Sequence, residues 1–409
     1  MRFLHAADIH LDSPLKGLDS YEGAPVELLR GATREALTAL VKLAIAERVA
    51  FVVLAGDLYD GDWPDYNTGL FLVKQMQQLQ RANIPVVLLR GNHDAESRIT
   101  GRLTLPPNVH SLETAAPSTV RFESLKVALH GQGFAKQAET RNLAANYPAP
   151  VPGYYNIGVL HTALGGREGH ANYAPCSVDE LIARGYDYWA LGHIHQRESV
   201  NGNRHPRIEF PGNMQGRHIR ETGAKGCLLV TVEGSVSTPE FHPLDVLRWE
   251  LVAVDAFAAE SSSELIDAAL SALAEAQAKS DGRPIAARLV ITCPEAIRLQ
   301  AAANAEEFRA DLCGQAGAGV WIEKVKWLQP AGAPSAAPLL GNDAVGEIRA
   351  VLGELQAAPE SAQEILASGD CEKLLKKLPA ELRNLLKEAW PDIVTRSADL
   401  LLSSAEEAA

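Results

Sequence analysis

The sequence contains few cysteines and no long apolar run, and these absences exclude several classes of protein. Only five of the 409 residues are cysteine, they are scattered, and no Cys-x-x-Cys pair occurs. This argues against a disulfide framework or a thiolate zinc site, and it fits a reducing cytoplasm. No apolar run reaches the roughly eighteen residues of a membrane span. The N-terminus turns acidic too soon for a signal peptide, so we expect none.

The sequence also lacks an excess of basic residues: its 38 lysines and arginines are outnumbered by 51 aspartates and glutamates, which gives a formal net charge of −13. A protein that grips nucleic acid by itself usually carries a basic excess. The charge therefore counts against strong autonomous DNA binding, but it leaves room for a nuclease whose partner holds the DNA. Apolar residues make up 46% and charged residues 22% of the chain, as in ordinary globular proteins. The length suggests two or three domains.

Three apolar runs in the first ninety residues alternate with two helical patterns. The runs predict strands at 2–7, 50–55 and 84–89, and the spacing of leucines and valines predicts helices at 33–47 and 67–81. Strands and helices in this order form a parallel sheet, and open α/β sheets bind ligands at the carboxyl edge of their strands. We therefore predict an α/β fold with a site at that edge.

The predicted strands end in residues that bind metals or transfer protons. Asp-Ile-His follows the first strand at 8–10, Gly-Asp the second at 56–57, and Gly-Asn-His-Asp the third at 91–94. Later strands, at 156–160 and 186–191, end in His161 and in Gly-His-Ile-His at 192–195. Five of the 12 histidines lie at these ends, which scattered structural histidines would not do. Alternation along a strand would put Asp8 and His10 on one side, although a turn carboxylate and a surface histidine give the same tripeptide.

Carboxylate, imidazole and amide-oxygen ligands without thiolates suit manganese, iron or zinc, with magnesium also possible, and the oxygen content favours manganese. Asp57, on the middle strand, is the natural bridge between two such ions. A dinuclear centre generates hydroxide at neutral pH and stabilises both oxygens of an in-line displacement at phosphorus. His93, beside a carboxylate in Asp94, is expected to protonate the leaving oxygen.

Taken in order, these motifs resemble those of the calcineurin-like metallophosphoesterases. The resemblance implies a four-layer α/β/β/α metallophosphoesterase sandwich and two divalent metal ions. It implies a catalytic pair, His93 and Asp94. It also implies two sets of metal ligands: Asp8, His10, Asp57 and His195 for one ion, and Asp57, Asn92, His161 and His193 for the other.

Three stretches are most similar to DNA repair exonucleases of the SbcD/YhaO type: residues 5–14, the Gly-Asp-Leu-Tyr-Asp at 56–60 and the Pro-Gly-Asn-Met-Gln-Gly-Arg at 211–217. That group often has Pro-Gly-Ser in this last loop, where the present chain has Pro-Gly-Asn. The resemblance implies a nuclease domain at 1–245 and a capping domain beyond it. It further implies DNA as substrate, an SMC-like ATPase partner and a homodimer, the usual state in this group.

The second half of the chain carries no cluster of chemically loaded residues. Strands are expected at 251–254, 287–292 and 320–325, with helices at 263–279 and 305–313, which predicts a small α+β capping domain at 246–330. A proline- and alanine-rich stretch predicts a linker at 331–339. Residues 340–409 are expected to form a C-terminal helical segment. Its leucines could bind a partner helix or pack within the segment: Leu374, Leu375, Leu378, Leu382, Leu385 and Leu386.

We therefore predict a cytoplasmic, manganese-dependent DNA nuclease that acts in DNA repair. The alternative is a small-molecule or cyclic-nucleotide phosphodiesterase or phosphatase with the same site. Phosphoprotein phosphatases usually have Arg-Gly after a motif like 56–60, and cyclic-nucleotide enzymes usually lack a segment like 248–409. A scaffold without activity is disfavoured because no expected ligand is missing.

Four further residues near the predicted site allow two interpretations each. Asp12 and Asp60 are more readily explained as caps of turns or helices than as supports of the metal ligands. Arg217 and His218 are equally well explained as contacts to a DNA phosphate and as ordinary surface residues.

Overall fold

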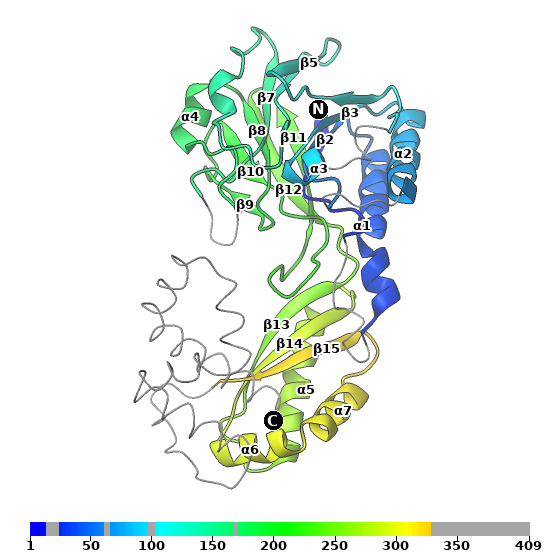
Figure 1. The fold of residues 1–409 in the computed structure, drawn as a ribbon, viewed down its shortest axis with the longest axis vertical. Helices are drawn as coiled ribbons and strands as arrows, with labels where there is room; N and C mark the ends of the chain where they lie inside the picture. Colours follow the sequence, from blue (N-terminus) through cyan, green and yellow to red (C-terminus); the bar gives the residue numbers. More distant parts are fainter. Residues whose placement is uncertain (14–23, 61–65, 97–102, 167–170, 329–409) are drawn as a thin grey trace, which may run out of the picture. The chain divides into compact units, whose positions relative to one another are not determined.

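The computed structural model describes residues 1–13, 24–60, 66–96, 103–166 and 171–328 (Figure 1). The expected linker at 331–339 and the helical segment at 340–409 lie outside these residues, so both stay predictions. Among the helices within the described ranges, none is long and apolar enough to cross a membrane.

Two six-stranded sheets form the part of the chain that carries the motifs (Figure 1). In spatial order the first consists of β12 (Val236–Pro243), β11 (Gly226–Glu233), β1 (Arg2–Ala6), β2 (Val52–Ala55), β3 (Val86–Leu89) and β4 (Val109–Ser111). The second consists of β5 (Ser118–Phe122), β6 (Val127–Gly131), β7 (Tyr155–His161), β8 (Tyr188–Gly192), β10 (Arg207–Phe210) and β9 (Glu198–Ser199). Within them β1 to β4 run parallel, and so do β6, β7, β8 and β10.

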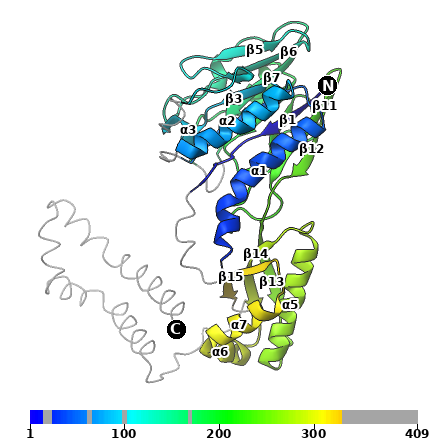
Figure 2. The ribbon, with the colours of Figure 1, turned by 90° about the vertical axis from the view of Figure 1, so that its right-hand side faces the viewer.

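Helices cover the outer faces of both sheets. They are α1 (Val26–Ala46) and α2 (Tyr66–Arg81) on the first sheet, and α4 (Val178–Ala183) with a 3₁₀ turn (Ala144–Asn146) on the second. A short helix, α3 (Asn92–Glu96), follows the carboxyl end of β3. Successive residues of the first sheet alternate between two cores, as a period of two requires. Leu4 and Val52 pack with α1 and α2, which lie side by side (Figure 2). Phe3 and Val53 pack against the second sheet.

The far face of the second sheet packs on α4, where Nε1 of Trp189 donates to the carbonyl of Leu181 at 3.1 Å. The layers are therefore helix, sheet, sheet and helix. This is the predicted four-layer α/β/β/α sandwich, and it brings carboxyl ends of strands from both sheets together.

The chain continues into a three-stranded sheet in the order β13, β14, β15. Its strands are β13 (Arg248–Asp255), β14 (Ile285–Thr292) and β15 (Val320–Trp327), and its helices are α5 (Ser262–Ala278), α6 (Glu295–Ala303) and α7 (Ala305–Gln315). Residues 1–255, 266–291 and 310–326 belong to one compact unit, and 256–265, 292–309 and 327–328 to a second. The expected domain boundaries near 245 and 330 stay predictions.

Several elements differ from the sequence expectations. Helix α1 begins at Val26 rather than near residue 33, because Leu29 is buried in a cluster with Leu247 and Trp249. Strand β12 was not expected, since it is an edge strand with one buried residue and no apolar run. The helix expected at 305–313 is confirmed as α7, whereas α6, which precedes it, was not expected.

Candidate metal centre

The carboxyl ends of five strands bring all the predicted site residues into one region. Strands β1, β2 and β3 come from the first sheet, and β7 and β8 from the second. The residues that follow or end these strands are Asp8, His10, Asp57, Asn92, His93, Asp94, His161, His193 and His195. The site therefore lies where the edges of the two sheets meet.

Four of these residues have positive backbone φ angles: 51° at Asp8, 46° at His10, 52° at Asp57 and 99° at His193. Asp8 and His10 face the same site, as expected, but strand alternation is not the reason, because neither residue is extended. A non-glycine residue with such a positive φ angle costs about 1–3 kcal/mol of conformational free energy, and such residues cluster at functional sites. Two hydrogen bonds of 3.0 Å hold the turn, from the amide of Asp8 to the carbonyl of Gly56 and from that of His10 to Asp57.

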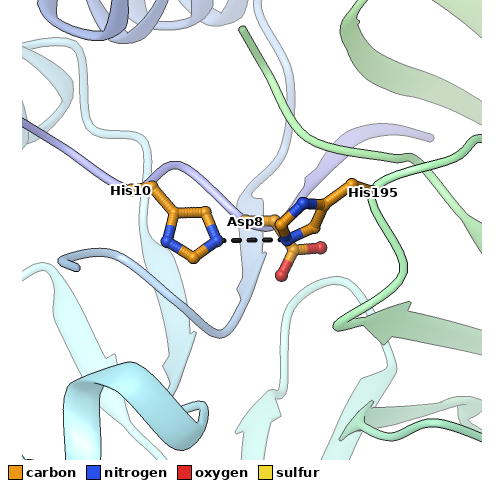
Figure 3. Close-up of side chains that lie close together, drawn as sticks. All are labelled: Asp8, His10 and His195. Atoms are coloured by element: carbon orange, nitrogen blue, oxygen red, sulfur yellow. Dashed lines mark hydrogen bonds between the residues drawn. The ribbon is translucent and has the colours of Figure 1, made fainter. Parts of the chain in front are cut away.

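The first group of ligand atoms belongs to Asp8, His10 and His195, and these atoms all lie within 4.8 Å of one another. Figure 3 shows the two imidazoles turned toward each other, with Nε2 of His10 3.2 Å from Nε2 of His195. Two nitrogens bound to one ion by bonds of about 2.1 Å at near-tetrahedral or octahedral angles are roughly 3.0–3.4 Å apart. The observed separation fits a shared metal ion.

The second group contains Asp57, His161 and His193. Nδ1 of His161 lies 3.0 Å from the carbonyl oxygen of Ala55, which can only accept, so this nitrogen carries the proton. The lone pair of Nε2 then faces Oδ1 of Asn92 at 3.0 Å and Oδ2 of Asp57 at 3.3 Å. With a neutral ring these would be three acceptor atoms that converge on one point, an arrangement that either a cation or a proton on Nε2 would satisfy.

Asp57 lies between the two groups. Its Oδ2 is 3.3 Å from Nε2 of His161 and 3.8 Å from Nε2 of His10. Its Oδ1 accepts a hydrogen bond of 3.0 Å from the amide of His93. Burial alone would raise the pKa of Asp57, but the imidazoles of His161, His10 and His93 lower it below its ordinary value. An ionised carboxylate in this position has the geometry of a bridging ligand.

The electrostatics of the site favour positive charge. Burial raises the pKa of Asp8 to about 6, against the opposing effect of His161 and His195. Burial alone would lower the pKa of His161, but Asp57 and Asp8 raise it to about 9. A proton on His161 thus takes the place that a cation would hold. The donor set and its charge therefore fit divalent metal ions.

His93 is oriented by a carboxylate other than the expected one. Its Nδ1 lies 3.0 Å from Oδ1 of Asp60. Asp94, by contrast, is 1% exposed and accepts from three backbone amides, those of Leu58, Tyr59 and Gly91. The expected pairing of His93 with Asp94 is therefore replaced by a pairing with Asp60, while Asp94 fixes the loop after β2.

The structure also shows what the two aspartates with open interpretations, Asp12 and Asp60, contact. Asp12 accepts from the side chains of Arg34 of α1 and Thr68 of α2, so it ties these helices together. These donors are not backbone amides, so the contacts do not make Asp12 a cap. Asp60 instead contacts His93 and lies 3.5 Å from Nδ1 of His10, which corrects the capping interpretation.

Arg217 is not an ordinary surface residue, and its contact with a DNA phosphate stays a prediction. Its side chain is 13% exposed, and its guanidinium pairs with Glu221 at 2.9 Å and lies 3.6 Å from Asp60. Glu221 was missed by the sequence analysis, although it lies 2.7 Å from Nδ1 of His195. No motif spacing marks it, because it is a lone glutamate in a loop. His218 is 52% exposed and 3.7 Å from the same carboxylate.

Two family models match the chain. The model described as calcineurin-like phosphoesterase matches residues 1–197, and the model described as metallophosphoesterase YhaO, middle domain, matches residues 249–328. The uncharacterized metallophosphoesterase YhaO of Bacillus subtilis (strain 168) is 36% identical over 300 residues, which are 72% of this chain and 73% of that protein.

Solved structures give weaker likenesses. A dimetal phosphatase from Danio rerio is 12% identical with a TM-score of 0.34, over 57% of this chain and 93% of that one. The Pseudomonas putida nuclease MPE is 19% identical with a TM-score of 0.19, over 37% and 57%. Scores this low support no inference about the present chain.

Proposed function

The chain belongs to the calcineurin-like metallophosphoesterase family, and from that premise we propose that it is a manganese-dependent DNA nuclease of the SbcD/YhaO type. The observation that carries the catalytic part is the pair of ligand groups joined by Asp57, with His93 beside them. This arrangement of ligands suits the hydrolysis of phosphate esters.

The residues divide between the two ions as the family pattern implies. Asp8, His10, Asp57 and His195 would hold one ion, and Asp57, Asn92, His161 and His193 the other. When bound, such ions supply hydroxide at neutral pH and stabilise the charge on the attacking and leaving oxygens. The protein supplies ligands fixed by backbone hydrogen bonds, such as the amide of His193 donating to Asp8 at 3.0 Å.

His93 is the proposed proton donor to the leaving oxygen. Its side chain is 33% exposed, so substrate can reach it, whereas Nδ1 is occupied by Asp60. Burial alone would lower its pKa, but the bond to Asp60 and the charges of Asp57 and Asp60 raise it. At neutral pH His93 is therefore protonated in a larger fraction of molecules than a free histidine would be, and Nε2 then carries a proton that it can transfer.

DNA as substrate is the further step of the proposal. It is supported by the motif resemblance and by a segment that matches the YhaO middle domain, which we propose caps the substrate. The net charge of −13 favours a division of labour in which an SMC-like ATPase holds the DNA. We propose further that the enzyme is cytoplasmic, acts in DNA repair and assembles as a homodimer.

The test is cleavage of an end-labelled DNA duplex with Mn²⁺, run beside bis-p-nitrophenyl phosphate. Wild type is compared with Asp57→Ala and with Asp179→Ala, a control at an exposed position of α4. We expect wild type and the control to cut both substrates and Asp57→Ala to cut neither.

The two substrates separate the parts of the proposal. Cleavage of the diester without the duplex would keep the dinuclear site and overturn autonomous DNA cleavage, and cyclic nucleotides would then test the alternative phosphodiesterase. Cleavage that persists in Asp57→Ala would overturn the site itself.

A further inference from the structure

We propose that Glu221, in the loop after β10, is a positioning residue that fixes the tautomer and ring orientation of His195 for metal binding. Its Oε1 lies 2.7 Å from Nδ1 of His195, and the residue is 5% exposed. The inference rests on metal binding by His195 in the proposed function, but not on DNA as substrate.

The hydrogen bond decides which nitrogen of His195 carries the proton. A carboxylate can only accept, so Nδ1 must donate to Glu221. A guanidinium nitrogen of Arg217 also lies near Nδ1, but at 3.4 Å, and the shorter bond to the carboxylate prevails. The lone pair of the neutral ring is therefore on Nε2, the atom that faces His10.

Glu221 is itself held rigidly. Its Oε2 accepts from the amide of Arg217 at 2.8 Å and from Nδ2 of Asn213 at 3.0 Å, while Oε1 also accepts from the guanidinium of Arg217 at 2.9 Å. With both oxygens fixed, the carboxylate presents a defined acceptor to His195. Supporting carboxylates of this kind set the basicity and orientation of metal-binding histidines.

The same loop also holds the backbone of His195. Nζ of the buried Lys225 donates to the carbonyl of His195 at 2.9 Å, and the amide of Asn213 donates to it at 3.3 Å. A Cβ on Gly212 would lie 3.0 Å from that oxygen, so the loop packs directly on it. Residues 211–225 thus hold both the ring and the backbone carbonyl of His195, which gives the Pro-Gly-Asn loop of the sequence a physical role.

The competing explanation is that Glu221 only neutralises Arg217. Glu209 provides the matched control, because it is also a buried glutamate, 3% exposed, and it pairs with Arg207 at 3.3 Å and Ser199 at 2.9 Å. Glu221→Gln keeps the shape and an acceptor oxygen, whereas Glu221→Ala removes the partner of Nδ1. Circular dichroism identifies any variant that fails to fold.

The first readout needs no metal. The full chain is labelled with ¹⁵N-histidine, freed of metal, and studied by NMR at pH 8, with His195 assigned by the signal lost in His195→Gln. We expect the Nδ1–H tautomer in wild type and Glu209→Gln, and a mixture of tautomers in Glu221→Ala. An unchanged His195 tautomer in Glu221→Ala would overturn this inference alone.

The second readout is Mn²⁺ binding, measured by electron paramagnetic resonance of the free ion. We expect two ions in wild type and Glu209→Gln, and about 10- to 100-fold weaker binding of one of them in Glu221→Ala. Equal binding of both ions in Glu221→Ala and wild type would overturn the role of Glu221. Wild type that binds no metal would instead overturn the proposed function, and with it the metal-binding part of this inference.

Discussion

Nδ1 of His93 lies 3.0 Å from Oδ1 of Asp60, so the ring beside the metal ligands is oriented by the carboxylate three residues after Asp57. Asp60 also lies 3.5 Å from Nδ1 of His10. One carboxylate thus supports both a proposed metal ligand and the proposed proton donor, which makes it a sensitive point of the site.

Asp60→Asn is expected to lower kcat for bis-p-nitrophenyl phosphate about 10- to 100-fold, a part of the usual contribution of a general acid. The pH profile carries the sharper test. Activity that needs protonated His93 is present below its pKa and is lost as pH rises through it. Because Asp60 raises that pKa, its removal should move the alkaline limb to lower pH.

His93→Gln should abolish this limb, and Asp179→Asn should leave the whole profile unchanged. An alkaline limb at the same pH in wild type and Asp60→Asn would show that Asp60 does not set the protonation of His93.

Gly91→Ala should destroy the site while a similar change elsewhere is harmless. A Cβ at residue 91 would lie 2.2 Å from Oδ1 of Asp57, far inside van der Waals contact. We expect the carboxylate to be displaced, with loss of at least 100-fold in activity and of metal uptake, since about 1 Å of misplacement can cost 10²-fold. Gly314→Ala, where nothing lies within 4 Å, is the control. Normal metal uptake by Gly91→Ala would contradict the tight packing at Asp57.

The residue pattern was sufficient for the parallel strands and for the clustering of the ligands, because buried parallel strands leave continuous apolar runs and rarely end in histidine or aspartate. The four-layer sandwich followed from the motif resemblance instead. The residue pattern was insufficient where contacts join distant loops. Glu221 meets His195 across 26 residues, and no spacing rule describes that contact. Asp60 was misread because a carboxylate after a strand caps a turn as often as it supports an imidazole.

Edges and helix starts were missed for a different reason. Strand β12 is an edge strand with a single buried residue, so its side chains carry little hydrophobic signal. The first turns of α1 are fixed by the burial of Leu29 against Trp249, a contact with a residue 220 positions away. Such elements depend on tertiary contacts rather than on local pattern.

Metal ions should stabilise the fold through the same ligands. A ligand at 100 times its Kd adds about 2.7 kcal/mol to the free energy of unfolding. We therefore expect Mn²⁺ to raise the Tm of wild type and of Asp179→Ala, and EDTA to reverse the rise. Asp57→Ala should show a much smaller shift, because it lacks the carboxylate between both groups. A wild-type Tm that does not change when Mn²⁺ is added would contradict the metal centre.

The last prediction concerns a histidine buried outside the site. His5 is 0% exposed on β1, where Nε2 donates to the carbonyl of Leu191 at 3.0 Å and Nδ1 lies 3.0 Å from the hydroxyl of Tyr188. This bridge between the two sheets requires a neutral ring, because Nδ1 accepts from the tyrosine. Burial lowers the pKa of His5 from 6.5 to about 3, despite the opposing effect of the bond to Leu191.

Between pH 6.5 and pH 3 the unfolded chain binds a proton at His5 that the folded chain does not, so stability must fall as pH falls through this window. From pH 6.5 to 5 the loss is about 2 kcal/mol. Urea unfolding at both pH values measures it. His5→Gln, which keeps a donor and an acceptor but cannot titrate, should be less stable at pH 7 yet lose about 2 kcal/mol less on acidification. Equal losses in both proteins would mean that His5 takes up its proton within the folded core.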